Sequence, residues 1–154
     1  MCLITRQTTP IILEEDLTVY KLVSVWRTSK SYNIFHSYIQ GFSYEKKVLY
    51  KTTIKRSEYP KWSDKKASKD YGFGNAKNLS QLKHLEELQK EDLVGYDRGF
   101  HSYLKRRGLL KRSSYGLKSD RIVECIIPKG SEVYYDESGL CISNQITVKK
   151  LCRK

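Results

Sequence analysis

Apolar and polar residues alternate most regularly in two parts of the chain. Near the N-terminus, residues 17–26 (LTVYKLVSVW) are rich in β-branched and aromatic residues, which favour a half-buried strand. In the last third, an apolar run at 121–127 is followed by shorter runs at 132–135, 140–142 and 146–151. The segments between them, PKG at 128–130 and DESG at 136–139, are rich in turn-forming residues. This part of the sequence therefore predicts an antiparallel meander.

The middle of the chain predicts a mixture of elements. Residues 47–55 suggest a strand with basic residues on one face, and leucines at every third position from 79 to 88 predict a helix over about 78–91. A second helix is expected over 102–112, weakened at Gly108. Residues 11–16 fit a turn or a helix start, and 31–40 fit one helical turn or a loop.

Together these elements predict an α+β fold with a mostly antiparallel sheet and two or three packed helices. The 154 residues fit one compact domain spanning the whole chain. Residues 56–76 are polar, contain Pro60 and show no clear period, so we expect a basic surface loop there.

No run of 18 apolar residues is present, and the N-terminus lacks the charged start and apolar core of a signal peptide. We therefore expect an intracellular, cytoplasmic protein that does not bind membranes; if it is encoded by a phage, the host cytoplasm is the expected compartment. The four cysteines (Cys2, Cys125, Cys141 and Cys152) lack the spacing of metal ligands. No metal site is predicted, and Cys125 and Cys141 are interpreted as small apolar residues of strands.

The chain has a formal net charge of +12, and this charge is arranged in blocks. Counting Lys and Arg against Asp and Glu, residues 45–69 carry +6, residues 100–121 carry +6 and residues 148–154 carry +4. The segments between these blocks are acidic, with −2 over 70–99 and −3 over 122–147. If the basic blocks meet in the fold, they produce a surface that attracts polyanions.

Aromatic residues alternate with the basic residues of the first block. Lysines and arginines of this kind neutralise phosphates, while exposed rings stack on bases without requiring a specific sequence. The alternative reading is a solvated basic face whose rings belong to the core. The candidate binding residues are Lys21, Lys47, Lys51, Lys55, Arg56, Trp62, Lys105, Arg106, Arg107, Lys111 and Arg112.

The order of motifs resembles the ADP-ribosyltransferase-like superfamily over residues 17–25 and 99–148. The resemblance depends on a first strand containing Lys21, a GFHS segment at 99–102 and the PKG turn before the last strands. It implies NAD as a ligand, with His101, Ser102 and either Glu132 or Glu137 as catalytic residues. The sequence departs from the family pattern because no carboxylate occurs at 143–145, where the catalytic Glu is expected.

His101 permits two interpretations. Because the unperturbed pKa of histidine is near neutrality, His101 could act as a general base or bind a phosphate. Alternatively, it is a structural histidine whose ring bonds to a backbone carbonyl at a strand end.

Three functions follow from these observations. The first is a small basic, non-enzymatic binding protein of the phage or mobile-element type. Its partner would be nucleic acid, a nucleotide or an acidic host protein, and it needs no cofactor; inhibition of a host defence system is one such role. The second is an ADP-ribosyltransferase-like enzyme or NAD-binding protein. The third is a structural protein that self-associates; the sequence leaves the oligomeric state open.

Overall fold

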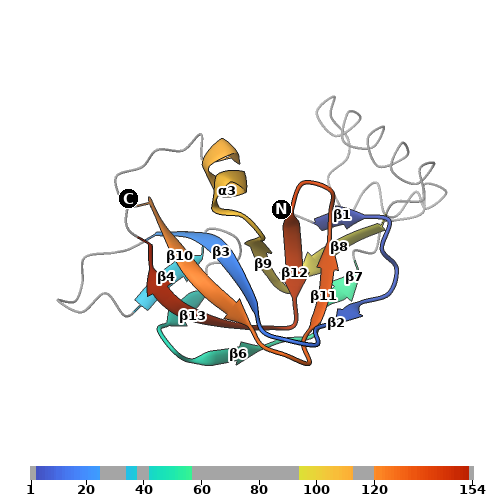
Figure 1. The fold of residues 1–154 in the computed structure, drawn as a ribbon, viewed down its shortest axis with the longest axis horizontal. Helices are drawn as coiled ribbons and strands as arrows, with labels where there is room; N and C mark the ends of the chain where they lie inside the picture. Colours follow the sequence, from blue (N-terminus) through green and yellow to red (C-terminus); the bar gives the residue numbers. More distant parts are fainter. Residues whose placement is uncertain (1–2, 25–33, 38–41, 57–93, 113–119, 153–154) are drawn as a thin grey trace, which may run out of the picture.

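The computed structural model describes residues 3–24, 34–37, 42–56, 94–112 and 120–152 (Figure 1). About 62% of these residues lie in strands, and most of the pairing is antiparallel. Within the described ranges, one helix is present, α3 (Arg106–Arg112). The α+β prediction with two or three helices is therefore wrong, and the fold is β-rich.

The described strands form two sheets. A three-stranded sheet has the order β1-β8-β7, and a ten-stranded sheet has the order β2-β11-β12-β9-β3-β10-β13-β6, with β4 paired to β3 and β5 paired to β4. The strands are β1 (Leu3–Thr5), β2 (Ile11–Ile12), β3 (Leu17–Ser24), β4 (Ile34–Ser37), β5 (Ser43–Glu45), β6 (Leu49–Lys51), β7 (Lys55–Arg56), β8 (Val94–Arg98), β9 (Phe100–Tyr103), β10 (Asp120–Ile127), β11 (Glu132–Tyr135), β12 (Leu140–Ser143) and β13 (Gln145–Leu151).

Several sequence predictions are confirmed. The strand expected at 17–26 is β3 as far as Ser24, the last described residue of this segment, and the run at 121–127 is β10. The closing runs form the strands β11, β12 and β13, but the predicted meander is wrong: β11 pairs with β12, whereas β12 pairs next with β9, and β13 pairs with β10 and β6. Residues 47–55 contain two short strands, β6 and β7, in place of one. The predictions of a turn or helix start at 11–16 and of a helical turn or loop at 31–40 differ from the structure, in which Ile11–Ile12 form β2 and Ile34–Ser37 form β4. The leucine-bearing segment 78–91 and the loop at 56–76, apart from Arg56, lie outside the described residues.

The second helix was predicted too long because residues 100–103 form β9. All four of these side chains are buried, and the strand pairs with β12, with Ser102 opposite Cys141. Pairing with β12 satisfies the backbone hydrogen bonds on one edge of β9, and packing on both faces of the sheet buries its side chains. This tertiary context outweighs the local helical pattern. The helix begins only at Arg106.

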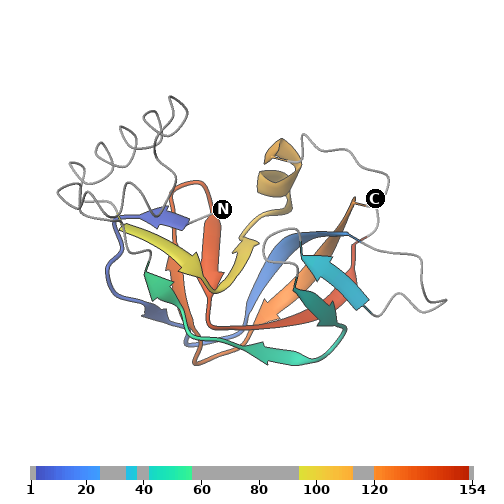
Figure 2. The ribbon, with the colours of Figure 1, turned by 180° about the vertical axis from the view of Figure 1, so that it is seen from behind.

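Part of the large sheet curls into a ring. β3 pairs with β10 along its whole length and with β4 on its other edge, and β10 pairs with β13. The turn after β5 then meets the far edge of β13, where Lys46 bridges Val148 and the Lys47 amide donates to the Val148 carbonyl at 2.8 Å. Figure 2 shows β4 and β5 lying in front of β3, β10 and β13, so these strands surround a common interior.

Two apolar cores lie on opposite faces of the shared strands. The first core, enclosed by the ring, contains Val19, Val23, Phe35, Tyr44, Phe100, Val123, Cys125, Ile127, Val133, Cys141, Ile146 and Val148. The second packs against the small sheet and α3 and contains Leu3, Val94, Tyr96, Tyr103, Leu109, Tyr134, Leu140 and Ile142. Since alternate residues of a strand face opposite sides, β9 and β12 contribute to both cores.

The turn between β11 and β12 is fixed by one carboxylate. Oδ1 of Asp136 accepts hydrogen bonds from the amides of Ser138 and Leu140, and Gly139 adopts a φ of 81° that glycine tolerates without strain. The sequence DESG therefore forms the tight turn it predicts. In the described part of the chain, no helix has the length and apolarity needed to span a membrane.

Candidate functional site

Two of the basic blocks meet along β13. Lys46 and Lys47 belong to the first block, and the hydrogen bond from the Lys47 amide holds them beside Val148. The last block begins at the next residue, with Lys149 and Lys150. Lys47 has a φ of 66°, a left-handed conformation that turns the chain sharply between β5 and β6. This turn brings residues about 100 positions apart into contact.

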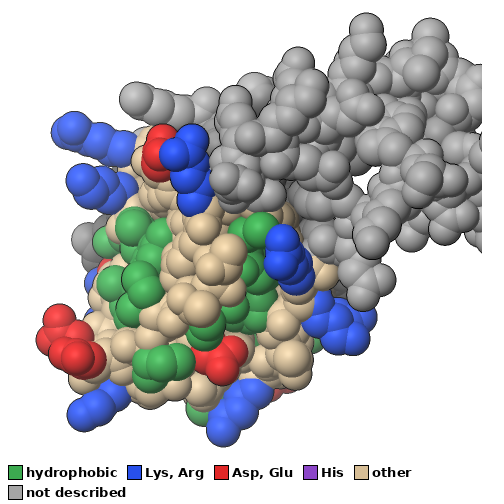
Figure 3. Space-filling view, turned by 90° about the vertical axis from the view of Figure 1, so that its right-hand side faces the viewer, with side chains coloured by type: hydrophobic (Ala, Val, Ile, Leu, Met, Phe, Trp, Pro, Cys, Tyr) green, Lys and Arg blue, Asp and Glu red, His purple; other side chains and the backbone are tan. Residues whose placement is uncertain are grey.

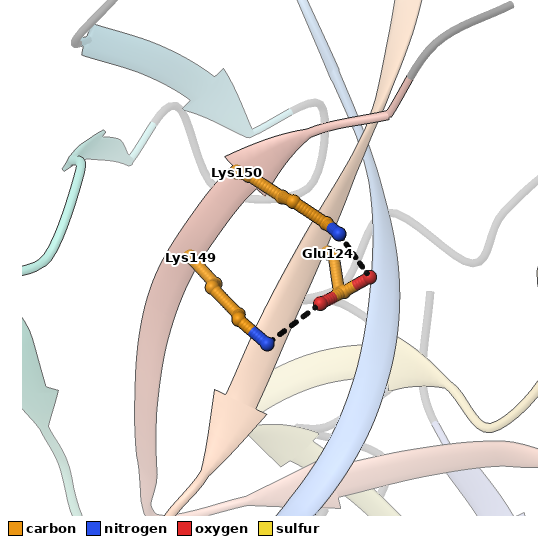
Figure 4. Close-up of polar contacts among 3 residues, drawn as sticks. All are labelled: Glu124, Lys149 and Lys150. Carbon is orange, nitrogen blue, oxygen red and sulfur yellow. Dashed lines mark ion pairs between the residues drawn. The ribbon is translucent and has the colours of Figure 1, made fainter.

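Lys149 and Lys150 both pair with Glu124 (Figure 4). The ammonium groups lie 3.2 and 3.5 Å from the two carboxylate oxygens. A shift in the β10–β13 register between Glu124 and Cys125 lets consecutive residues of β13 reach one partner. Both lysine side chains remain more than half exposed, so they still present charge to solvent.

The third basic block approaches the far end of β13 through α3. Burial raises the pKa of the Cys152 thiol, while the positive charges of Arg106 and Lys150 oppose this rise. The positive charge of Arg106, at the start of α3, therefore acts on the residue that follows β13. The exposed residues Lys105 and Arg107 flank Arg106 in sequence.

These side chains form the basic strip, which we define as Lys46, Lys47, Lys51, Lys149, Lys150 and Arg106. Lys51 pairs with Gln145 at one end of β13, and Arg106 lies near Cys152 at the other. At about 3.3 Å per residue, the strip spans about 23 Å. Within the described residues, Glu124 is a carboxylate that contacts strip lysines directly.

A cluster of aromatic rings adjoins the Lys51 end of the strip. Phe42 contacts Tyr44, Tyr50 and Phe100 with centroid separations of 4.9, 5.3 and 6.1 Å, all in edge-to-face geometry. Tyr44 and Phe100 are buried in the first core, whereas Phe42 remains 38% exposed. The cluster thus connects the core to an exposed ring.

Lys21 is buried inside the ring of strands. Its ammonium group donates to the backbone carbonyl of His101 and lies 5.3 Å from the centroid of the Tyr44 ring, a cation–π contact. Desolvation lowers the Lys21 pKa from 10.5 to about 8. The residue is 4% exposed, so in this conformation its charge is enclosed by the core and is separate from the basic strip.

His101 is equally buried, on the other face of β9. Burial, together with the positive charge of Lys21, lowers its pKa to about 4, so the ring is neutral at physiological pH. Hydrogen bonds to the backbone of Gly99 and Tyr96 weakly oppose this shift. Among the described residues, its Nε2 has no hydrogen-bond partner.

The other predicted catalytic residues do not gather around His101. Ser102 is fully buried and lies 3.1 Å from the sulfur of Cys141. Burial raises the pKa of Cys141 to about 11 and that of Cys125 to about 12, so both thiols stay protonated at neutral pH. Glu132 lies on β11, two strands and two residues away from His101, which corresponds to about 12 Å between Cα atoms.

The remaining predicted binding residues are dispersed. Lys55 and Arg56 are exposed but belong to β7 of the small sheet. Lys111 and Arg112 belong to α3, of which the structure describes only the backbone at these two positions. Trp62 lies outside the described residues. No group of three potential metal ligands occurs in the described ranges.

Three lysines of the basic strip and the neighbouring Phe42 were not among the candidate residues. Lys46, Lys149 and Lys150 were counted only in the net charges of the first and last basic blocks, and these charges were the signal that could have identified them. Phe42 had no signal, because one phenylalanine between two polar segments is compatible with a core or a surface position.

A different face of the molecule is more apolar. Figure 3 views the side on which β2 and β7 lie in Figure 1, where hydrophobic side chains gather in the middle and Lys and Arg side chains stand singly around the margin. Ile11 and Ile12 of the sheet-edge strand β2 are both about half exposed.

Comparison with known proteins gives no relative: no family model, curated protein or solved structure matches this sequence. The resemblance to ADP-ribosyltransferases therefore stays a prediction.

Proposed function

We propose that this protein binds nucleic acid through the basic strip. The observation that carries the proposal is the meeting of three basic blocks along β13, at Lys47, Lys149 and Arg106. Clustered lysines and arginines neutralise phosphates and release counterions from the polyanion, which is the main source of sequence-independent affinity.

The length of the strip favours an extended polyanion over a mononucleotide. About 23 Å corresponds to about seven base-pair steps along a duplex axis at 3.4 Å per step, which is longer than a mononucleotide. Six positive side chains lie along this length, and two of them, Lys149 and Lys150, also pair with Glu124. If each neutralises one phosphate, the logarithm of the affinity for a single strand falls with the logarithm of salt with a slope of about −4.

The test is fluorescence anisotropy with a labelled oligonucleotide of 20 nucleotides at 50 and 200 mM salt. We expect affinity to fall by about 300-fold between these conditions. The double variant Lys47→Glu/Lys51→Glu should bind at least about tenfold more weakly at 50 mM and show a shallower salt slope. Arg6→Glu/Lys55→Glu is the charge-matched control, because both residues are exposed, Arg6 follows β1 and Lys55 lies in β7 of the small sheet.

Two outcomes contradict the proposal. One is the absence of binding at 50 mM salt. The other is displacement of the labelled oligonucleotide by polyglutamate of equal charge more readily than by unlabelled nucleic acid, which would indicate an acidic protein as the partner.

A further inference from the structure

An exposed aromatic ring lies beside the basic strip. Phe42 contacts Tyr50, and Tyr50 precedes Lys51 in β6. Among the described strands, β6 ends the sheet and has β13 as its neighbour. The side chains of Tyr50 and Lys51 point to opposite faces of β6. The Phe42 ring, which contacts Tyr50, and the Lys51 ammonium group therefore lie on opposite sides of this edge strand.

The ring of Phe42 is held in place before any ligand binds. Three aromatic neighbours contact it, and two of them, Tyr44 and Phe100, are buried. Little side-chain freedom remains to be lost on binding, which raises the affinity available from its exposed surface. A preformed apolar ring next to phosphate-binding charges matches the pattern of sites for single-stranded nucleic acid, in which bases stack on aromatic side chains.

We infer that the strip binds single-stranded nucleic acid in preference to duplex, with an unpaired base stacked on Phe42. This inference rests on the proposed function and names the form of nucleic acid that it involves. The phosphates contact Lys51 and its neighbours on the outer face, and one base turns around the edge of β6 onto the ring.

The preference for a single strand follows from the availability of bases. In a duplex each base is stacked between its neighbours, and placing one on Phe42 requires unstacking and unpairing. The charges of the strip attract both forms, because duplex and single strand both carry phosphates. The Phe42 ring therefore accounts for the preference for single strand over duplex, whereas the lysines bind both forms.

The first test changes the ligand and leaves the protein intact. Wild-type protein is titrated with a deoxythymidine 12-mer, the same 12-mer with abasic residues throughout, and a 12-base-pair duplex, all at 50 mM salt. We expect the abasic strand to bind about tenfold or more weakly than the thymidine strand, since stacking on one ring is lost. Equal affinity for these two strands would overturn the inference.

The second test changes the ring. Phe42→Leu keeps an apolar side chain in the cluster and removes the stacking surface, so affinity for the thymidine strand should fall about tenfold while affinity for the abasic strand stays unchanged. Phe42→Trp should restore the preference for bases. Ile12→Ala is the control, because Ile12 is an exposed apolar residue on β2. Loss of affinity for both strands in Phe42→Leu would contradict base stacking.

The two proposals fail in different ways. If no oligonucleotide binds at 50 mM salt, the proposed function fails. If the single strand and the duplex bind with equal affinity through the lysines, only the preference for single strands fails. A vesicle arm with anionic lipid completes the design: tighter, Phe42-dependent binding to vesicles than to the thymidine strand would assign the ring to a membrane surface and overturn the inference.

Discussion

The ammonium group of Lys21 donates a hydrogen bond to the backbone carbonyl of His101, which joins β3 to the neighbouring strand β9. Burial of a lysine is costly unless it is paired or loses its proton. The lowered pKa of Lys21 and the contact with the Tyr44 ring show how this chain accommodates the charge.

Lys21→Met provides a test of this arrangement through pH. Between pH 8 and 10.5 the unfolded chain holds a proton on Lys21 that the folded protein has released, so stability rises with pH in this window. From pH 7 to 9.5, wild type should gain about 2 kcal/mol relative to Lys21→Met in urea unfolding. A constant difference across this range would contradict the burial of a charged Lys21.

His101 predicts acid sensitivity of the fold. Its pKa is lowered from 6.5 to about 4, so the stability that neutral His101 provides is complete above pH 6.5 and is lost as pH falls toward 4. From pH 7 to 4.5, wild type should lose about 2 kcal/mol more than His101→Phe, whose ring does not titrate. The measurement is the urea midpoint at each pH; parallel acid profiles of the two proteins would oppose a buried, neutral histidine.

Gly99, between β8 and β9, predicts a strong steric effect. It has a φ of 144°, and a Cβ atom there would lie 2.5 Å from Cγ1 of Ile142. We expect Gly99→Ala to destabilise the protein by about 2 kcal/mol or more, measured by thermal and urea unfolding. Gly130→Ala is the control, because Gly130 has a φ of 82° but no atom within 4 Å of the added Cβ. Equal losses in both variants would mean that backbone strain alone determines the cost.

Removing the charge of Glu124 should increase the affinity for nucleic acid. Glu124→Gln removes the carboxylate that both Lys149 and Lys150 contact, while the change in stability should stay below about 1 kcal/mol because the lysines are exposed. Affinity for a single strand should rise about two- to tenfold at 50 mM salt, with a smaller gain at 200 mM. Glu137→Gln, at an exposed position in the β11–β12 turn, is the control; an equal gain there would show that only net charge matters.

The strands were predictable because alternation is a local property. Val19 and Val23 point to the same face of β3 as Lys21, so the alternation contained the information that this lysine faces the core, although it was predicted to be a binding residue. The pairing of Lys46 with Val148 was not predictable, because it depends on the curl of the sheet and on a left-handed turn at Lys47. Local propensity does not determine which distant strand edge a turn will meet.

The candidate site was predictable only in its composition. Charge counting identified the basic blocks, but it could not separate Lys51, which lies on the strip, from Lys55, which lies on the small sheet. Likewise, the GFHSY segment indicated chemistry at His101, whereas pairing on both sides buries it. Burial is a property of the assembled sheet, which a short motif does not contain.

The pairing of β3 with β10 has a consequence for the order of events during synthesis. Lys21 lies opposite Val123, so β3 leaves the ribosome about 100 residues before its main partner. At a synthesis rate of about 5–20 residues per second, the apolar side chains of β3 remain without their partner strand β10 for about 5–20 seconds. Such long-range pairing also slows folding. During this interval Val19 and Val23 of the nascent chain are exposed, and chaperones can bind them. The first core can close only after the segment that contains β10 has emerged.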